Sequence, residues 1–259
     1  MKSPSYKYMQ KLSYSGIRGS IAQYVRFATR FFRPFFSIEV NAHRLVEFRS
    51  QHKDITYTPI LLKIIATAAE KYPIMNGILA RPFLRKKIYV PGEVDISIAM
   101  EKNYKGETFV AIPIVRSVNE KSIKTIASEI NYLSNLPYEK LPDIKPVLFF
   151  HKLPDFWKYW SLKFICRSPR VFKLFFGTIG FSNLGKFGIT IASPTWVNNI
   201  VFGIGTIEEK PIVINGEIEK APILHITMGF NHAVIDGAMA GRILSEVKGL
   251  IENSDYSSL

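Results

Sequence analysis

Hydrophobic and polar positions follow two different periods near the C-terminal end of the chain. Large apolar side chains occupy every second position of residues 223–230, which predicts a strand buried on one face. From Met239 to Leu250 apolar residues recur at helical spacing, which predicts an amphipathic helix. The stretch 231–237 therefore lies where a strand ends and a turn leads into a helix.

The same two periods predict elements throughout the rest of the chain. The predicted elements are a helix from Ser15 to about Phe32, a strand over 33–40, a buried helix over 59–72, a strand over 94–99, a charged turn over 101–109, a return strand over 110–115, a helix over 122–133 and a strand over 200–213. This succession of strand, helix, strand, hairpin and helix is typical of an α+β layered sandwich. Gly203 and Gly205 belong to a predicted strand that no helix follows, so they do not form a dinucleotide-binding loop.

Composition narrows the setting and the chemistry. The chain has 259 residues, 47% of them apolar, which is enough to bury a large core. Its five histidines are scattered and Cys166 is its single cysteine, so neither a disulfide framework nor a Cys/His zinc site is expected, and we predict no metal. A reducing, cytoplasmic location is the default prediction, since we find neither a signal peptide nor a segment long enough to span a membrane.

The chain is strongly basic. Lys and Arg number 34 against 21 Asp and Glu, giving a formal net charge of +13. This balance favours an anionic partner, which is a nucleic acid, an acidic membrane surface or a phosphorylated cofactor such as coenzyme A. Neither a zinc finger nor an RNP-like aromatic strand is visible, so we predict no nucleic-acid partner.

His232 is the candidate for chemistry in the stretch 231–237. The alternation of 223–230, continued by two positions, predicts that its imidazole points inward rather than into bulk water. A neutral imidazole in that position can act as a general base. The alternative is a hydrogen-bonded core histidine, which is the more common situation for a single histidine on an apolar face.

Two motifs change this balance. The pattern His232-x-x-x-Asp236-Gly237 lies between a predicted strand and a predicted helix, and residues 177–188 read Gly-Thr-Ile-Gly-Phe-Ser-Asn-Leu-Gly-Lys-Phe-Gly. Both resemble signatures of the chloramphenicol acetyltransferase-like superfamily, and in particular the catalytic domain of the 2-oxo acid dehydrogenase acyltransferase, the E2 component. Residues 15–22, 71–77 and 200–213 resemble further parts of that domain, so the resemblance extends from Ser15 to about Asn253.

The resemblance implies a fold and a site. The fold would be an α+β, chloramphenicol acetyltransferase-like two-layer sandwich, with helices packed on a mixed central sheet. His232 would be the general base for a coenzyme A-dependent acyl transfer, and Ser182 would donate a hydrogen bond to the oxyanion. Asp236 belongs to the catalytic motif but would anchor the turn through an arginine, a role we assign to Arg18. Asn183 and Gly237 would support the site.

The resemblance also implies an assembly. The family forms a homotrimer in which the histidine of one subunit and the serine of its neighbour share a channel, and coenzyme A enters from one end. Asn231 and Ala233 replace the Asp and Arg that the family places around the histidine, so the acceptor is a thiol, a hydroxyl or an amine. We expect residues 1–259 to be a single, stand-alone catalytic domain without lipoyl attachment or a subunit-binding domain.

The segment at about 137–176 departs from the family pattern. Basic residues alternate with aromatic ones throughout this basic aromatic insertion. Three interpretations remain open for it: helices packed over the core or along a subunit contact, an amphipathic segment lying on an anionic membrane, and a cover for the acyl chain or substrate. The competing hypothesis for the whole chain is a non-catalytic trimeric module that uses the insertion to dock on a membrane or a protein partner.

Overall fold

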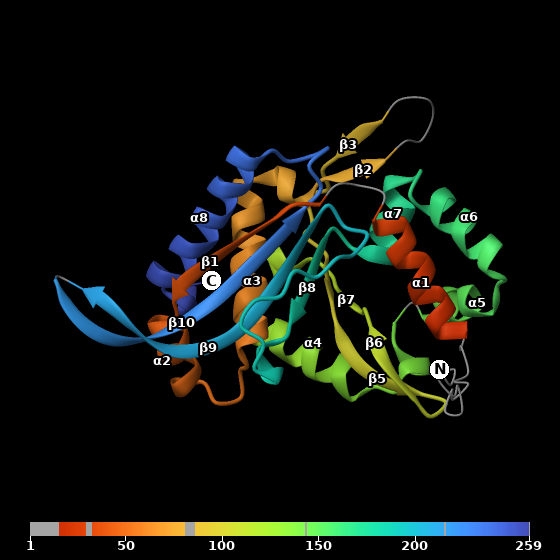
Figure 1. Ribbon diagram of the computed structural model, residues 1–259. Coiled ribbons are helices and arrows are strands. Elements are labelled where there is room, and N and C mark those ends of the chain that lie inside the picture. Colours follow the sequence, from red (N-terminus) through yellow and green to blue (C-terminus); the bar gives the residue numbers. More distant parts are fainter. Residues whose placement is uncertain (1–15, 30–32, 81–85, 143, 215, 259) are drawn as a thin grey trace, which may run out of the picture.

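A mixed six-stranded sheet forms the centre of the protein in the computed structural model (Figure 1). The structure describes residues 16–29, 33–80, 86–142, 144–214 and 216–258. In spatial order the strands are β1 (Phe35–Asn41), β10 (Glu217–Phe230), β9 (Ile200–Ile214), β8 (Ile179–Asn183), β4 (Ile96–Ile98) and β7 (Ile114–Val115). The strand pairs β9/β8 and β8/β4 are parallel and the others are antiparallel.

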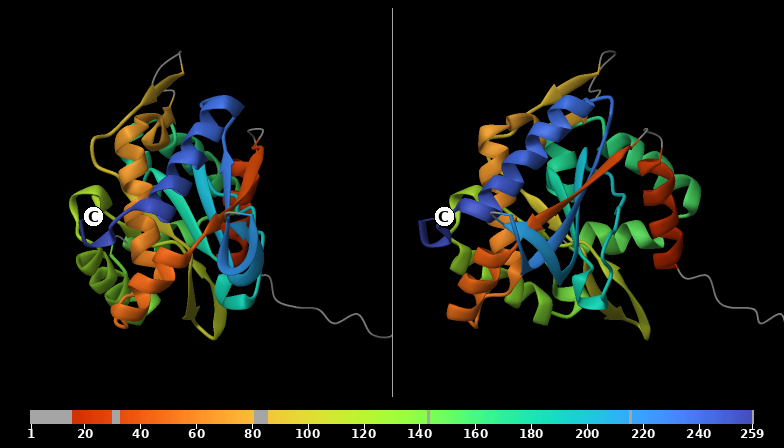
Figure 2. Two further views of the ribbon diagram at one scale, coloured as in Figure 1. Left: turned by 90° about the vertical axis from the view of Figure 1, so that its left-hand side faces the viewer. Right: turned by 60° about the vertical axis from the view of Figure 1, so that its left-hand side comes forward.

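Helices cover one face of the sheet and enclose the main core. They are α2 (His43–Gln51), α3 (Tyr57–Lys71), α4 (Ile123–Asn135) and α8 (Gly237–Asn253). Seen from the side, the helical layer and the sheet lie next to each other (Figure 2). Helix α3 is apolar almost all round, and its residues from Pro59 to Ala66 are all buried, as predicted for this segment. The predicted α+β two-layer class is therefore confirmed.

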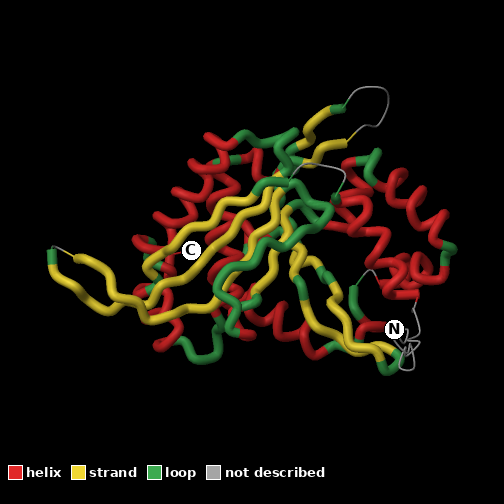
Figure 3. Tube along the Cα trace, viewed as in Figure 1, coloured by secondary structure: helices red, strands yellow, loops and turns green. Residues whose placement is uncertain are grey.

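The other face of the sheet is also covered, which the sequence did not predict. Residues 223–230 of β10 are buried on both faces, whereas their alternation predicted burial on one. An irregular segment, residues 189–197, crosses this second face without forming a strand there, and it belongs to the loops drawn in green in front of the yellow strands in Figure 3. The crossing is so close that a Cβ atom on Gly205 would lie 1.9 Å from the Thr190 carbonyl oxygen, and one on Gly203 would lie 2.2 Å from that of Ala192. Both positions therefore require glycine.

The predicted charged turn over 101–109 is instead most of a hairpin. Strands β5 (Met100–Tyr104) and β6 (Glu107–Ala111) pair in register and are joined by only Lys105 and Gly106, with φ angles of 51° and 80°. Two left-handed residues are what a tight two-residue hairpin turn requires. Glu101, Lys102 and Glu107 therefore lie on strands, and of the charged residues Lys105 alone lies in the turn. A second small hairpin is formed by β2 (Ile78–Ala80) and β3 (Lys87–Tyr89).

A second group of helices lies beside the sheet, around its own small core. It contains α1 (Gly16–Ala28), α5 (Ile144–Lys152), α6 (Asp155–Ile165) and α7 (Pro169–Phe176). Helix α1 contacts both α5 and α6, and Phe27, Phe150, Leu162, Phe172 and Phe176 are buried together. The N-terminal helix thus runs from Gly16 to Ala28, while Ser15 and residues 30–32 of the predicted helix lie outside the described residues.

His151 links three elements of this region. Its Nε2 lies 2.7 Å from the Tyr138 hydroxyl and its Nδ1 lies 2.8 Å from Ser20 Oγ, which in turn donates to the Gly16 carbonyl. The consistent arrangement is a neutral ring that accepts from Tyr138 and donates to Ser20. Burial, with a smaller contribution from the charge of Lys158, lowers the pKa of His151 to about 4.

This shift predicts a pH dependence of stability. The pKa of His151 in the folded protein, about 4, lies below the ordinary value of 6.5, so the unfolded chain binds more protons between these two values. The stabilisation is present above pH ~6.5 and is lost as the pH falls toward ~4. In urea unfolding across this window, wild type should lose more stability than His151→Gln. His43→Gln, on an exposed side chain, should keep the wild-type slope; equal slopes for all three would contradict the assignment.

Candidate functional site

The turn that carries His232 is held by asparagine side chains. Asn231 is buried, its Oδ1 accepts from the Ala233 amide at 3.0 Å, and its Nδ2 donates to Asn199 Oδ1 at 2.9 Å. Asn199 Nδ2 donates in turn to the Gly77 carbonyl at 2.8 Å, and the amides of Val234 and Ile235 both donate to the Asn231 carbonyl. The backbone on either side of His232 is thus fixed through groups other than its own ring.

His232 itself is exposed in the single chain, contrary to the prediction that it points inward. Strand β10 ends at Phe230, so the alternation that placed His232 in phase with the core does not continue into the turn. The imidazole lies beside the Phe230 ring, with 5.9 Å between the ring centroids. The histidine is therefore presented at the surface on a rigid support.

Asp236 is the N-cap of α8. Its Oδ1 accepts a hydrogen bond from the Met239 amide at 2.8 Å, which pairs one of the free amides of the first turn. The negative carboxylate also interacts favourably with the partial positive charge at the N-terminus of the helix. The side chain of Arg18, its predicted partner, lies outside the described part of the structure. Gly237 is the first residue of α8, where a Cβ atom would lie 3.6 Å from Phe36 Cζ, an ordinary contact distance.

Ser182 lies on β8, toward the face of the sheet that does not carry α3 and α8. It is opposite Gly203 on β9, Gly203 is opposite Thr227 on β10, and Thr227 is opposite Ser37 on β1, so small and hydroxylic residues form a row across four strands. Ser182 is 9% exposed. None of the other described residues makes a hydrogen bond with its hydroxyl, which leaves the hydroxyl able to donate to a ligand.

Asn183 fixes the end of this strand. Its Oδ1 accepts from the Gly185 amide at 3.1 Å, and its Nδ2 donates to Thr58 Oγ1 of α3 at 3.2 Å. The side chain thereby ties the turn after β8 to the helical layer. Asn183 and Ser182 form one group of predicted site residues, and His232, Asp236 and Gly237 form another.

These two groups lie toward opposite ends of the sheet. Strand β8 is parallel to β9, whereas β10 is antiparallel to it, so the carboxyl end of β8 and the carboxyl end of β10 point in opposite directions. His232 is five positions beyond Thr227, which is level with Ser182. At about 3.3 Å per residue this is a separation of about 15 Å along the strands alone. One chain does not bring His232 and Ser182 together.

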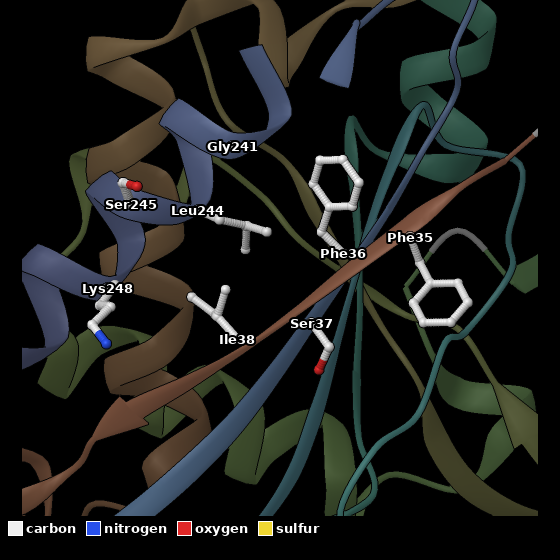
Figure 4. A pocket seen from close by; sticks show the side chains of 8 residues that line it. All are labelled: Phe35, Phe36, Ser37, Ile38, Gly241, Leu244, Ser245 and Lys248. Carbon is white, nitrogen blue, oxygen red and sulfur yellow. The ribbon is translucent and has the colours of Figure 1, made fainter. Parts of the chain in front are cut away.

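A groove lies next to the His232 group, between β1 and α8 (Figure 4). Its volume is about 460 Å³, and it is lined by Phe35, Phe36, Ser37, Ile38, Gly241, Leu244, Ser245 and Lys248. The Phe36 ring packs edge-on against Phe230, with 5.3 Å between centroids, and Phe230 contacts His232. A mostly apolar wall, with one lysine, thus continues from the histidine along the outer strand.

The asparagines are the site residues that the sequence did not reveal. The sequence marked Asn231 only as a departure from the family pattern, and it predicted no role for Asn199. Their signal is weak, because two asparagines, Asn198 and Asn199, before a strand are equally typical of an ordinary loop. Within the described ranges there is no group of three or more His, Cys, Asp or Glu side chains arranged to hold a metal.

The arrangement of sheet and helices is the chloramphenicol acetyltransferase-like fold. A structure described as chloramphenicol acetyltransferase aligns with 90% of this chain and 95% of its own, with a TM-score of 0.53 and 13% identity. A probable dihydrolipoamide acetyltransferase from Listeria monocytogenes aligns with 96% of this chain and 98% of its own, with a TM-score of 0.72 and 20% identity. The fold expected from the resemblance is confirmed.

The chain belongs to the family of 2-oxoacid dehydrogenases acyltransferase (catalytic domain), whose model matches residues 7–140 and 174–258. It is 28% identical over 255 residues to the dihydrolipoyllysine-residue acetyltransferase component of the pyruvate dehydrogenase complex of Bacillus subtilis, covering 92% of this chain and 49% of that protein. The chain thus spans about half the length of such curated relatives. Residues 141–173, which contain α6, fall between the two matched ranges.

Proposed function

We propose that this acyltransferase domain moves an acyl group between coenzyme A and an acceptor thiol, with His232 as general base and Ser182 as oxyanion donor. The observation that carries the proposal is that Ser182 offers a hydroxyl with no hydrogen-bond partner among the described residues, while the turn of His232 is fixed by buried asparagines. Membership of the family supports the reaction class. The family and the curated relatives, which are named as acyltransferases, do not support the alternative of a non-catalytic module.

The chemistry needs a base and an anion site. A thiol with a pKa of ~8.5 is mostly protonated at neutral pH, so the neutral imidazole of His232 would take its proton as the sulfur attacks the acyl carbonyl. The attack makes a tetrahedral oxyanion, to which the Ser182 hydroxyl would donate a hydrogen bond. The carbon–sulfur bond of the donor then breaks, and the leaving thiolate takes the proton back from the imidazolium. No covalent enzyme intermediate is required.

The two groups of site residues would meet between subunits. Since one chain holds His232 and Ser182 toward opposite ends of the sheet, a complete site requires His232 of one copy and Ser182 of another. A homotrimer, the state that the sequence resemblance implies, provides three such sites by rotation. An aligned structure with a TM-score of 0.72 is described as the cubic core of a pyruvate dehydrogenase multienzyme complex, so assembly is known for that protein.

The relatives favour a dihydrolipoyl thiol as acceptor. The curated matches include a dihydrolipoyllysine-residue acetyltransferase and a lipoamide acyltransferase component of a branched-chain alpha-keto acid dehydrogenase complex, both from Bacillus subtilis. The lipoyl group would be carried on a separate domain. An aligned structure of the Azotobacter vinelandii dihydrolipoamide acetyltransferase is described as an investigation of the role of a serine, a histidine and an asparagine in the catalytic mechanism, the last two spaced as His232 and Asp236 are. The cytoplasmic location stays a prediction.

The shared site can be tested by complementation. Ser182→Ala and His232→Ala should each be nearly inactive in exchange of acetyl, isobutyryl and longer acyl groups between coenzyme A and dihydrolipoamide. After dissociation and random reassembly of an equal mixture, about a quarter of the sites should contain both native residues and regain activity. Differently tagged wild-type chains show whether subunits exchange. No recovery despite exchange would contradict a site shared between subunits, and an inactive wild type across the panel would contradict the proposed reaction.

A further inference from the structure

Helix α6 carries a row of exposed aromatic side chains. Phe156, Trp157, Trp160 and Phe164 are 65%, 60%, 48% and 74% exposed. Their positions recur at intervals of three and four residues, so they occupy one side of the helix, and we call them the aromatic stripe. Phe156 stacks edge-on with Trp157, with 5.8 Å between centroids. Such a cluster is unusual on a water-exposed helix and indicates a binding surface.

The side of α6 that faces the protein does not use these residues. Leu162 is fully buried there, and Lys158 is 3% exposed, with its Nζ bonded to the Gly16 carbonyl and to Asp155. The helix therefore buries a lysine and exposes two tryptophans, which reverses the ordinary pattern of a helix packed on a core. Packing against α1 accounts for the buried residues of α6 but gives no reason for its exposed aromatic residues.

The surroundings of the stripe are positively charged. Lys163 Nζ lies 4.3 Å from the Trp160 ring centroid, and Arg167 and Arg170 follow as exposed residues at the end of α6 and the start of α7. Residues 144–176 contain one acidic residue, Asp155, and seven basic residues, five Lys and two Arg. Tryptophan rings, which are amphipathic, together with flanking cations match the headgroup region of an anionic bilayer.

The location of α6 leaves the stripe accessible. The helix lies on the outer side of the second helical group, at the end of the molecule away from the tip of the β9–β10 hairpin (Figure 1). It falls in residues 141–173, outside the ranges matched by the family model, so contacts common to the family need not involve it. No helix of the described chain is long and apolar enough to cross a membrane.

We propose that the aromatic stripe of α6, with its flanking cations, docks the protein on an anionic lipid bilayer. The two tryptophans would lie at the depth of the headgroups while Lys163 and Arg167 pair with lipid phosphates. Helix α6 is already folded against α1, so binding would require no ordering of a disordered segment. The docking is independent of acyl transfer and does not rest on the proposed reaction.

Co-sedimentation of the full chain with vesicles tests the proposal. Wild type should bind vesicles of phosphatidylglycerol mixed with phosphatidylcholine at low salt, weakly at high salt, and weakly to phosphatidylcholine alone. The variant in which Phe156, Trp157, Trp160 and Phe164 are all changed to Gln should lose affinity for these vesicles by about tenfold or more. Lys163→Glu with Arg167→Glu should cause a similar loss.

Matched changes elsewhere control for surface hydrophobicity and charge. Val213→Gln with Ile218→Gln removes residues 71% and 78% exposed on the β9–β10 hairpin, and Lys220→Glu reverses a remote charge. These controls should bind as wild type does. Trp157→Phe with Trp160→Phe should still bind but lose the blue shift of tryptophan emission, since only Trp196 remains of the three tryptophans.

Three results would overturn the docking proposal. The first is no binding to anionic vesicles at low salt. The second is equal loss of binding in the stripe and hairpin variants, which would show general stickiness. The third is lipid-independent, concentration-dependent association of wild type that the stripe variant abolishes, which would identify a second copy of the chain as the occupant. Circular dichroism of each variant excludes loss of folding as the cause.

Discussion

Replacing His232 with alanine is expected to lower the rate of acyl exchange by about 10²–10⁴-fold. The substitution removes the group that would accept the thiol proton. The variant can then react only with the small fraction of the thiol that is already ionised. Because the ring is exposed and its turn is fixed by Asn231 and Asn199, the fold of the single chain should be unaffected. Stopped assays of acetyl transfer from coenzyme A to dihydrolipoamide measure the effect.

The form of the loss separates chemistry from binding. An effect on kcat, with the KM for coenzyme A largely kept and with activity partly recovered at high pH, is expected for a lost base. His43→Ala, another exposed histidine, should react at the wild-type rate and serves as the control. A His232→Ala protein of wild-type activity, or one that loses its oligomeric state, would contradict the role of His232 as base.

Changing Gly205 to alanine should cost about 3 kcal/mol of unfolding free energy, or prevent folding. The added Cβ would lie 1.9 Å from the Thr190 carbonyl oxygen and 2.8 Å from its carbon, and both atoms belong to backbone that cannot rotate away. The crossing segment is held there by the Thr206 amide, which donates to the Ile189 carbonyl at 2.9 Å. A thermal melt should show a decrease of roughly 6–12 °C.

Gly249 provides the matched control for this substitution. It lies in α8, and a Cβ atom there would have nothing within 4 Å. Gly249→Ala should be neutral or stabilise by up to about 1 kcal/mol, because alanine restricts the unfolded chain and favours helix. If both variants melted alike, the close crossing over β9 would not be a determinant of stability.

Periodicity alone predicted most of the elements in the two main layers. The buried helix α3 and the amphipathic helices α4 and α8 were found because their apolar residues recur at intervals that only a helix brings together. Strand β8, which contains Ser182, was not predicted by periodicity, and residues 177–188 were recognised only as a motif. The local pattern of apolar residues is sufficient to predict an element when the element packs through one apolar face.

Contacts distant in sequence decided what the pattern missed. The second covered face of β10 depends on where residues 189–197 cross, and nothing in the strand itself encodes this. His232 was predicted to face inward because the alternation was extended beyond Phe230, whereas the strand ends at Phe230 and the next side chain, that of Asn231, donates a hydrogen bond to Asn199. Helix α6 was the hardest case, since its aromatic side is the exposed one.

The support of the His232 turn by asparagine side chains has a consequence for control. In the single chain His232 and Ser182 lie toward opposite ends of the sheet, so the site is incomplete until another copy closes over the turn of His232. In the proposed trimer that copy is the next subunit, which also brings Ser182. Newly made monomers would then be inactive in acyl transfer, and dilution that dissociates the trimer would abolish activity without any change in the fold of the subunit.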